Sequence, residues 1–431
     1  MDSSTLTFDG VEYPGGRASD PGLLGWMEGT PPPADKLVRF TDDRVLDFPQ
    51  IRWSLSHMRE LLPTVNVWRG EGPPGDIGGA PRAADEIAID ELTFVDMNGT
   101  KRNWLDSLYD TYTDGIVVLH RGRRVYERYF GALRPHMPHS CFSVTKSYAA
   151  TLAATLVHEG VLDESKHVPH YLPEMRGTAY EDATLREVMD MQTGVDYSEV
   201  YTDRNSGVWA YSRAGGTRPR PANYSGPQSF YEYLRTLRKD GEHGQAFAYK
   251  TINTEVMCWV MKKVTGIGLA DMLSERFWAP LGCEQDGFVT VDPIGVPMGG
   301  GGMSASLRDM ARFGEMLRCE GSWHGRQVVP SAVVADIGKG ADPAKFAKAG
   351  YVLLQGHSYR NMWWVSHNEL GAFEAKGIHG QRIHVAPKAE MVVARFASHP
   401  VAGNFGNDPI TLPALLALGK MLTSSPASNL R

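Results

Sequence analysis

The chain has 431 residues, of which 42% are hydrophobic and 22% charged, and its formal net charge is −6 at pH 7. This length can bury a large core in one or two domains. The negative charge, without any basic run, disfavours nucleic acid and anionic membrane surfaces as partners. We therefore expect a soluble globular protein.

The four cysteines, Cys141, Cys258, Cys283 and Cys319, are scattered without Cys-x-x-Cys spacing. This pattern indicates neither a zinc site nor a disulfide framework, and it is typical of a reducing compartment. The N-terminus is acidic and polar, unlike a secretory signal, and no apolar run could span a bilayer. If Met1 is the natural start, the sequence predicts a cytoplasmic protein.

Residues 1–110 are interrupted by Pro31–Pro33 and by the Gly- and Pro-rich residues 70–81, with one amphipathic helix predicted between them over Trp53–Leu62. Such a segment can hardly form a core of its own. We expect an N-terminal arm that packs on the main body, with disorder as the weaker alternative.

Regular structure is expected to begin near Thr113. Residues 114–120 and 124–130 are apolar or alternating on either side of a turn at Arg121–Arg123, which predicts a β-hairpin. Residues 141–160 follow as a helix that is rich in Ala, Thr and Leu on all sides, and this composition is typical of a buried helix. A hairpin followed by a buried helix indicates a helix packed on an antiparallel sheet.

Helical periodicity dominates residues 161–286, with helices predicted over 184–191, 229–238 and 253–265. Between the first two, residues 197–224 are rich in Gly, Pro, Asn, Arg and aromatics. A long loop inside a compact domain is usually a lid or binding loop. We therefore predict a helical domain over residues 161–286 that carries a lid at about residues 197–224.

The pattern returns to strands in the last third of the chain. A helix over 306–319 is followed by strands predicted over 361–366, 373–378, 382–386 and 391–397, and by a last helix over 412–422. Short links make these strands an antiparallel meander. The predicted fold class is α+β, with a discontinuous sheet-containing domain (residues 111–160 and 287–431) interrupted by the helical insertion.

Ser143 and Lys146 lie three residues apart at the start of the predicted buried helix, so they share one face. A serine becomes nucleophilic when a base takes its proton, and burial at a helix N-terminus lowers the pKa of a lysine enough to make it that base. The alternative is a capping serine and a solvated lysine, because Ser-x-x-Lys is short enough to occur by chance.

Several stretches in chain order resemble the serine β-lactamase and penicillin-binding superfamily, in its class C and esterase-like branch that includes the 6-aminohexanoate-dimer hydrolases. The matching stretches are FSVTKS, VMDMQTGVDYSEVYTD, FAYKTINTEV, MGGGGMSASLRDMAR, MWWV and GIHGQ. The resemblance covers about residues 110–410. It implies a β-lactamase/transpeptidase-like fold, an antiparallel sheet flanked by helices with an all-helical insertion.

The resemblance also implies catalytic roles. Ser143 would be the acylated nucleophile, Lys146 its proton acceptor and Tyr249 the relay of a proton to the leaving group. The family's Tyr-x-Asn pattern is altered here, since Thr251 stands at the Asn position. The strict match Tyr359-Arg360-Asn361 lies too late in the chain and is interpreted as chance.

The family's Lys-Thr-Gly strand motif is replaced by a stretch that includes Gly377, Ile378 and His379. By resemblance, Gly377 and His379 contact substrate, and the backbone amides of Ser143 and Ile378 form the oxyanion hole. Two aimed backbone donors are all that this role requires. The missing Lys-Thr pair normally binds the carboxylate of a β-lactam, so its loss disfavours lactamase activity.

Tyr201 and Trp209 fall in the predicted lid, at places that match lid residues of the 6-aminohexanoate-dimer hydrolases. Without the resemblance, loop aromatics are more often packing residues. With it, Tyr201 is the better candidate for a substrate contact.

These features predict a serine hydrolase that forms an acyl-enzyme on a small amide or ester, with no cofactor and no metal. His167 and His170 have no recognisable third ligand near them. A short linear amide like the 6-aminohexanoate dimer is the first expectation, a small carboxylic ester the second and a β-lactam the third. A non-catalytic penicillin-sensor-like domain is the alternative from another class, and a homodimer is compatible with the sequence.

Overall fold

The computed structural model describes residues 5–8 and 10–424. Its centre is a seven-stranded sheet in the order β13-β14-β15-β16-β17-β6-β7, with antiparallel neighbours throughout. The strands are β6 (Thr113–His120), β7 (Arg123–Tyr129), β13 (Ser358–Arg360), β14 (Trp363–Val365), β15 (Phe373–Gly377), β16 (Gln381–Ala386) and β17 (Met391–Ala397). The hairpin of β6 and β7 thus joins the C-terminal meander through the pairing of β6 with β17, and the predicted α+β fold is confirmed.

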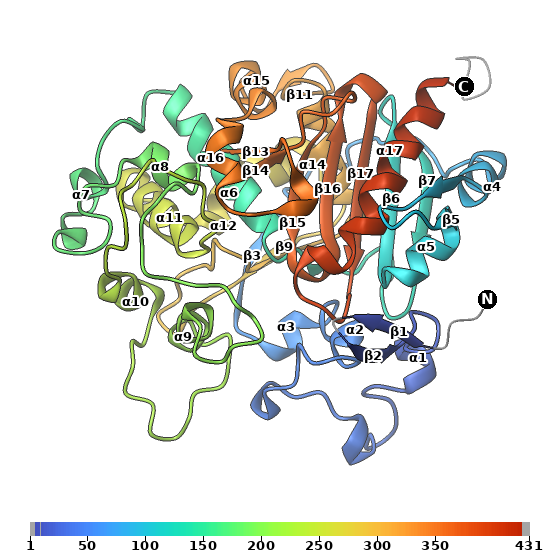
Figure 1. The fold of residues 1–431 in the computed structure, drawn as a ribbon, viewed down its shortest axis with the longest axis horizontal. Helices are drawn as coiled ribbons and strands as arrows, with labels where there is room; N and C mark the ends of the chain where they lie inside the picture. The colour runs from blue at the N-terminus through green and yellow to red at the C-terminus, as the bar shows by residue number, and fades with distance from the viewer. Residues whose placement is uncertain (1–4, 9, 425–431) are drawn as a thin grey trace.

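Helices cover both faces of this sheet. They are α4 (Ala83–Asp90), α5 (Trp104–Asp110), α6 (Val144–His158), α14 (Leu307–Arg318) and α17 (Asp408–Ser424). Along β6, Val117 and Leu119 join the core with α6 and α14, whereas Ile116 and Val118 join the core with α5 and α17. Alternate residues of a strand point to opposite faces, so a strand covered on both faces is apolar throughout. Figure 1 shows α17 in front of the sheet.

The helical block lies to one side of the sheet (Figure 1). Its helices are α7 (Val168–Tyr171), α8 (Leu185–Met189), α9 (Gly207–Ala214), α10 (Phe230–Thr236), α11 (Ile252–Thr265), α12 (Leu269–Leu273) and α13 (Ala279–Leu281). The helices predicted over 184–191, 229–238 and 253–265 are confirmed. The predicted loop over 197–224 needs correction, because it contains α9, which buries Val208, Tyr211 and Ala214 at helical spacing.

A second sheet, ordered β3-β9-β10-β8, connects the N-terminal arm to the start of α6. Its strands are β3 (Thr64–Val67), β8 (His139–Ser140), β9 (Gly287–Thr290) and β10 (Met303–Ala305). β8 pairs with β10, and the amide of Cys141 donates to the carbonyl of Met303 over 2.8 Å. This pairing places the glycine-rich residues 299–302 beside the N-terminus of α6.

The arm contains the short elements β1 (Thr5–Phe8), β2 (Val11–Pro14), α1 (Pro21–Leu24), α2 (Ile51–Ser54), α3 (Met58–Leu61), β4 (Thr93–Val95) and β5 (Lys101–Asn103). The helix predicted over 53–62 is therefore two short helices. The expectation that the arm has no core is also corrected, since Trp26, Val38, Val45 and Trp53 form a small buried cluster. The division into an arm, a sheet domain and a helical domain stays a prediction.

The remaining elements are β11 (Ser322–Trp323), β12 (Arg326–Gln327), α15 (Ser331–Lys339) and α16 (Pro343–Ala347). The strand predicted over 361–366 begins later, at Trp363, because Asn361 and Met362 have positive φ angles of 49° and 57° and form the turn between β13 and β14. Within residues 5–8 and 10–424, no helix is long and apolar enough to cross a membrane.

Candidate active site

Ser143 and Lys146 meet at the N-terminus of α6, as the spacing predicts. Ser143 occupies the N-cap position, and its Oγ lies 2.8 Å from Nζ of Lys146 in a hydrogen bond. Both residues are buried, with exposed fractions of 8% and 1%. The helix carries small and apolar residues on every side, so it lies inside the core and takes the lysine with it.

The environment of Lys146 lowers the pKa of its amine and makes the neutral form easier to reach. Burial lowers the pKa of Lys146 to about 8, while the negative charges of Glu199 and Glu255 act in the opposite direction. The Nζ atom also donates a hydrogen bond to the carbonyl oxygen of Gly300. A lysine with a pKa near the working pH can accept a proton from the serine hydroxyl.

A buried carboxylate, Glu255 on α11, holds the backbone that carries the Gly300 carbonyl. Glu255 accepts hydrogen bonds from the amide of Gly299 (3.1 Å), from the amide of Gly300 (2.8 Å) and from the hydroxyl of Tyr211 on α9 (2.6 Å). A Cβ atom at Gly300 would lie 2.3 Å from Cγ2 of Thr251. Glycine is therefore required where this backbone approaches α11.

Tyr249 lies directly before α11, and the structure brings it to the same site. Nζ of Lys146 lies 5.2 Å from the centroid of its ring, which stacks on Trp364 of β14 at 5.6 Å. Burial raises the pKa of the Tyr249 hydroxyl well above its ordinary value, the charge of Glu199 adds to this, and a hydrogen bond with Ser143 acts against it. The phenol therefore keeps its proton near neutral pH and can donate it.

The end of β15 lies against the backbone that precedes Ser143. A Cβ atom at Gly377 would lie 2.6 Å from the carbonyl oxygen of Cys141, and the rings of Phe142 and His379 have centroids 5.5 Å apart. Phe142 and His379 both have positive φ angles, 43° and 62°. Such backbone strain in non-glycine residues is concentrated at functional sites. The residues on either side of Ile378 thus pack against the two residues that precede Ser143.

His379 is a neutral group in this site. Burial lowers the pKa of His379 to about 4, and its Nδ1 lies 2.7 Å from the carbonyl oxygen of His399 in a hydrogen bond. An imidazole with this pKa is uncharged at neutral pH. It can therefore take part in hydrogen bonding or packing, not in charge pairing.

Tyr201 and Trp209, in the segment predicted to be a lid, contact each other, and Tyr201 also contacts Glu199. The Tyr201 hydroxyl donates to Glu199 over 3.0 Å, and Nε1 of Trp209 donates to the Tyr201 carbonyl over 3.2 Å. Glu199 in turn accepts a hydrogen bond from the backbone amide of Thr251, two residues after Tyr249. These contacts tie the lid to the loop that carries the tyrosine.

Sequence reasoning missed two acidic residues of this site, Glu199 and Glu255. Both lie inside stretches that match the family, but neither belongs to a short catalytic motif. The Tyr359-Arg360-Asn361 match proves structural: Tyr359 packs edge-on against Tyr249, while Arg360 and Asn361 hydrogen-bond to Asp336.

Lys376, which precedes Gly377 on β15, belongs to a buried ionic network. Its Nζ atom lies 2.6 Å from Oδ2 of Asp408, and Asp408 also pairs with Arg382. Arg382 and His384 each lie 2.7 Å from Glu374. The network lies behind the edge of the site and fixes the direction of Lys376.

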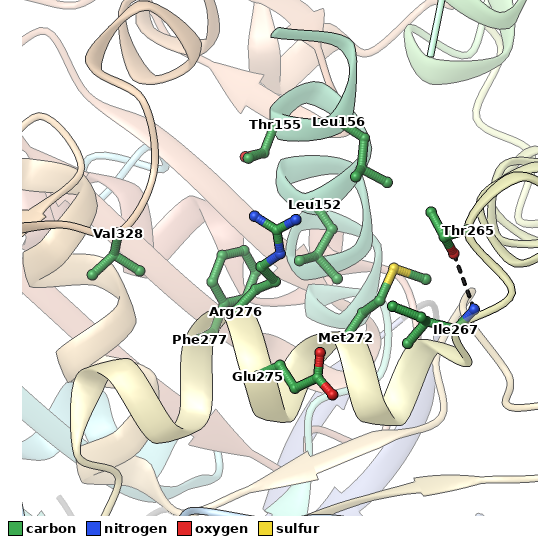
Figure 2. Close-up of a pocket in the computed structure, with 10 residues that line it drawn as sticks. All are labelled: Leu152, Thr155, Leu156, Thr265, Ile267, Met272, Glu275, Arg276, Phe277 and Val328. Atoms are coloured by element: carbon green, nitrogen blue, oxygen red, sulfur yellow. Dashed lines mark hydrogen bonds between the residues drawn. The ribbon is translucent and has the colours of Figure 1, made fainter. Parts of the chain in front are cut away.

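A small pocket of about 40 Å³ lies beside the C-terminal half of α6 (Figure 2). It is lined by Leu152, Thr155 and Leu156 of α6, by Thr265 and Ile267, by Met272, Glu275, Arg276 and Phe277, and by Val328. The α6 residues that line it lie two to three turns beyond Lys146, so this pocket is separate from the serine and lysine.

Comparison with known proteins agrees with the geometry of the site. The β-lactamase family model matches residues 105–416. The 6-aminohexanoate-dimer hydrolase of Paenarthrobacter ureafaciens is 33% identical over 393 residues, which cover 90% of this chain and 91% of that protein.

Solved structures show the same relationship. A Bacillus anthracis protein, provisionally named a 6-aminohexanoate-dimer hydrolase, is 29% identical with a TM-score of 0.82, covering 92% of this chain and all of that one. A D-stereospecific amidohydrolase from Streptomyces shares the fold at 18% identity and a TM-score of 0.51, covering 68% and 92%. Because the family model spans most of the sequence, and a relative above 30% identity covers nearly all of it, this chain belongs to the β-lactamase family of serine hydrolases.

Proposed function

We propose that this protein hydrolyses short linear amides through an acyl-enzyme, with Ser143 as nucleophile, Lys146 as base and Tyr249 as proton relay. The 2.8 Å contact between Lys146 Nζ and Ser143 Oγ in a buried site carries this proposal. The similarity to the Paenarthrobacter enzyme, whose name gives 6-aminohexanoate dimer as its substrate, supports an amide of that kind.

The proposed reaction has two balanced halves. Lys146 takes the proton of the Ser143 hydroxyl, Oγ attacks the carbonyl carbon, and the amides of Ser143 and Ile378 receive the oxyanion. Tyr249 and Lys146 then deliver a proton to the leaving nitrogen as the C–N bond breaks. In the second half, Lys146 takes a proton from water, the water oxygen attacks the acyl carbonyl carbon, and the bond from that carbon to Oγ breaks as Oγ regains the proton, which releases the acid.

The protonated state of the Tyr249 phenol favours an amide over an ester as the substrate. An amine leaves only after it is protonated, whereas an ester oxygen leaves readily. Burial keeps the proton on Tyr249, beside the nucleophile, where it can serve that step. A β-lactam is disfavoured, because Lys376 is paired with Asp408 and is not free to bind a lactam carboxylate.

A panel of substrates tests the proposal. We expect release of 6-aminohexanoate from its linear dimer, some hydrolysis of p-nitrophenyl esters, and little or none of the β-lactam nitrocefin. Hydrolysis of esters alone would identify a carboxylesterase and overturn the amidase proposal.

Tyr249→Phe should reduce the turnover of amides more than that of esters. The phenol can be lost with little change in packing, so the missing proton relay is the main effect, and an amine depends on it more. We expect a loss of about a hundredfold on the amide, the lower end for general acid catalysis, and a smaller loss on the ester. Turnover numbers for a matched amide and ester provide the measurement, and equal full activity on both would make Tyr249 a packing residue.

Glu255→Gln should change both the rate and its pH dependence. The carboxylate holds the Gly300 carbonyl that binds Lys146, so its loss should lower the plateau of kcat/KM by about tenfold. Its negative charge also raises the pKa of Lys146, so removing that charge should lower this pKa. A neutral Lys146 is then available at lower pH, and the acidic limb of the profile should move to lower pH.

Tyr211→Phe is the matched control for Glu255→Gln. It removes one hydrogen bond from the same carboxylate but leaves the charge in place. We expect a lower plateau with the acidic limb unchanged. If both variants left the limb in the wild-type position, Glu255 would not act on Lys146 through its charge.

A further inference from the structure

The lid (residues 197–224) carries an unusual concentration of positive charge around one aromatic ring. The guanidinium carbons of Arg204, Arg213 and Arg218 lie 5.3, 5.9 and 4.6 Å from the ring centroid of Trp209. We name these three arginines the lid arginines. Guanidinium groups stack well on an indole face, but three like charges around one ring repel one another unless anions compensate them.

Few acidic groups compensate the lid arginines. Arg218 pairs with Asp43 over 3.0 Å, whereas Arg204 and Arg213 have no carboxylate within ion-pair distance in the described part of the chain. Asp203 lies in the same lid and is exposed, and its carboxylate accepts a hydrogen bond from the backbone amide of Asn205.

Arg220, a fourth arginine of the lid, is hydrogen-bonded to neutral groups rather than to carboxylates. It binds the carbonyl oxygens of Arg213, Ala214 and Gln228 and the Gln228 side chain. The lid thus contains four arginines and two acidic residues, Glu199 and Asp203, on a chain whose overall net charge is −6.

This positive region adjoins the proposed active site. Trp209 is hydrogen-bonded to Tyr201, and Tyr201 is hydrogen-bonded to Glu199, which also binds the loop that carries Tyr249. Arg218 also acts on His379, the residue after Ile378 at the end of β15. Its positive charge adds to the effect of burial in lowering the pKa of His379. Arg218 therefore acts electrostatically on the end of β15, and Arg204 and Arg213 surround the same Trp209 ring as Arg218.

We propose that the lid arginines bind a carboxylate of the substrate, so that the enzyme selects substrates with a negatively charged end. The inference rests on the hydrolase activity proposed above and adds the substrate's charge to it. Guanidinium groups bind carboxylates through paired, charge-assisted hydrogen bonds. A positive region on an acidic protein also attracts anions into the site. A linear dimer of an amino acid has one such carboxylate end.

Two sets of esters test this proposal with the full-length enzyme. The first places the charge on the acyl side: the p-nitrophenyl monoester of adipic acid, p-nitrophenyl hexanoate and p-nitrophenyl 6-aminohexanoate. The second places it on the leaving group: 4-carboxyphenyl hexanoate and 4-carbamoylphenyl hexanoate. In at least one set we expect kcat/KM for the carboxylate to exceed that for the neutral ester by about tenfold, with the advantage shrinking towards about 0.3 M salt.

Variants connect the preference to the lid. The double variant Arg204→Gln/Arg213→Gln should reduce the ratio of carboxylate to neutral kcat/KM by about fivefold, because Arg204 is exposed and Arg213 partly exposed. Arg176→Gln removes one arginine charge from an exposed site in the helical block outside the lid and should leave the ratio unchanged.

The outcomes separate this inference from the proposed function. If no ester is hydrolysed, or if Ser143→Ala retains the hydrolysis, the proposed function fails and the inference with it. If hexanoate esters are cleaved through Ser143 but neither set favours the carboxylate, the anion-binding role is overturned and the hydrolase stands. An unchanged ratio in the double variant also overturns the role of these arginines.

Discussion

Ser143→Ala is expected to lower hydrolysis of every substrate by about four to six orders of magnitude, the range for loss of a catalytic serine. A covalent mechanism has no second nucleophile, and Lys146 would then face a methyl group instead of a hydroxyl. The same serine should be the residue modified by a serine-directed phosphonate. Mass spectrometry of the labelled protein measures this directly.

Ser140→Ala is the matched control for this prediction, since it makes the same change three residues earlier, in β8. This variant should still be labelled at Ser143 and should keep its activity. Labelling at any other serine in the wild-type protein, or residual turnover in Ser143→Ala well above the uncatalysed rate, would refute the assignment of the nucleophile.

Asp408→Asn is expected to destabilise the protein by about 3–5 kcal/mol, the usual cost of removing one partner from a buried ion pair. Asp408 is buried and pairs with both Lys376 and Arg382. An amide cannot neutralise two cations, so Glu374 would be left as the main counter-charge of the network. Unfolding in urea, followed by circular dichroism, gives the change in free energy.

Asp106→Asn provides a comparison of the same chemistry at the surface. Asp106 pairs with Arg17 over 3.2 Å, and both side chains are more than half exposed. An exposed pair of this kind contributes less than about 1 kcal/mol. If the two variants lost the same free energy of unfolding, the buried network would contribute no more to stability than an exposed ion pair.

The sequence predicted the parts of the site that depend on local geometry. Ser143 and Lys146 are one helical turn apart, so their contact follows from the helix itself. Tyr249 came only from resemblance, because no local rule brings it beside α6. Glu199 and Glu255 act through backbone amides of loops distant in sequence, and neither partner can be identified before the chain is folded.

Errors in secondary structure also have local causes. The apolar pattern over residues 53–62 predicts one helix, but the side chains of Ser56 and His57 hydrogen-bond to the carbonyl of Trp53. Such bonds compete with the helical pattern and end α2. The sequence pattern does not reveal β13 as a separate strand, because a tight two-residue turn at Asn361–Met362 separates it from β14 and neither residue is a glycine.

The pairing of β6 with β17 has a consequence for how the chain folds. It joins Thr113 to Ala397 and His120 to Met391, residues made at very different times during synthesis. Contacts so distant in sequence require a costly loop closure and slow the folding of β-rich proteins. Until the C-terminal strands emerge from the ribosome, the apolar edge strand β6 of the β6–β7 hairpin has no partner. An unpaired edge of this kind is prone to aggregation, so rapid synthesis would favour inclusion bodies over the native protein.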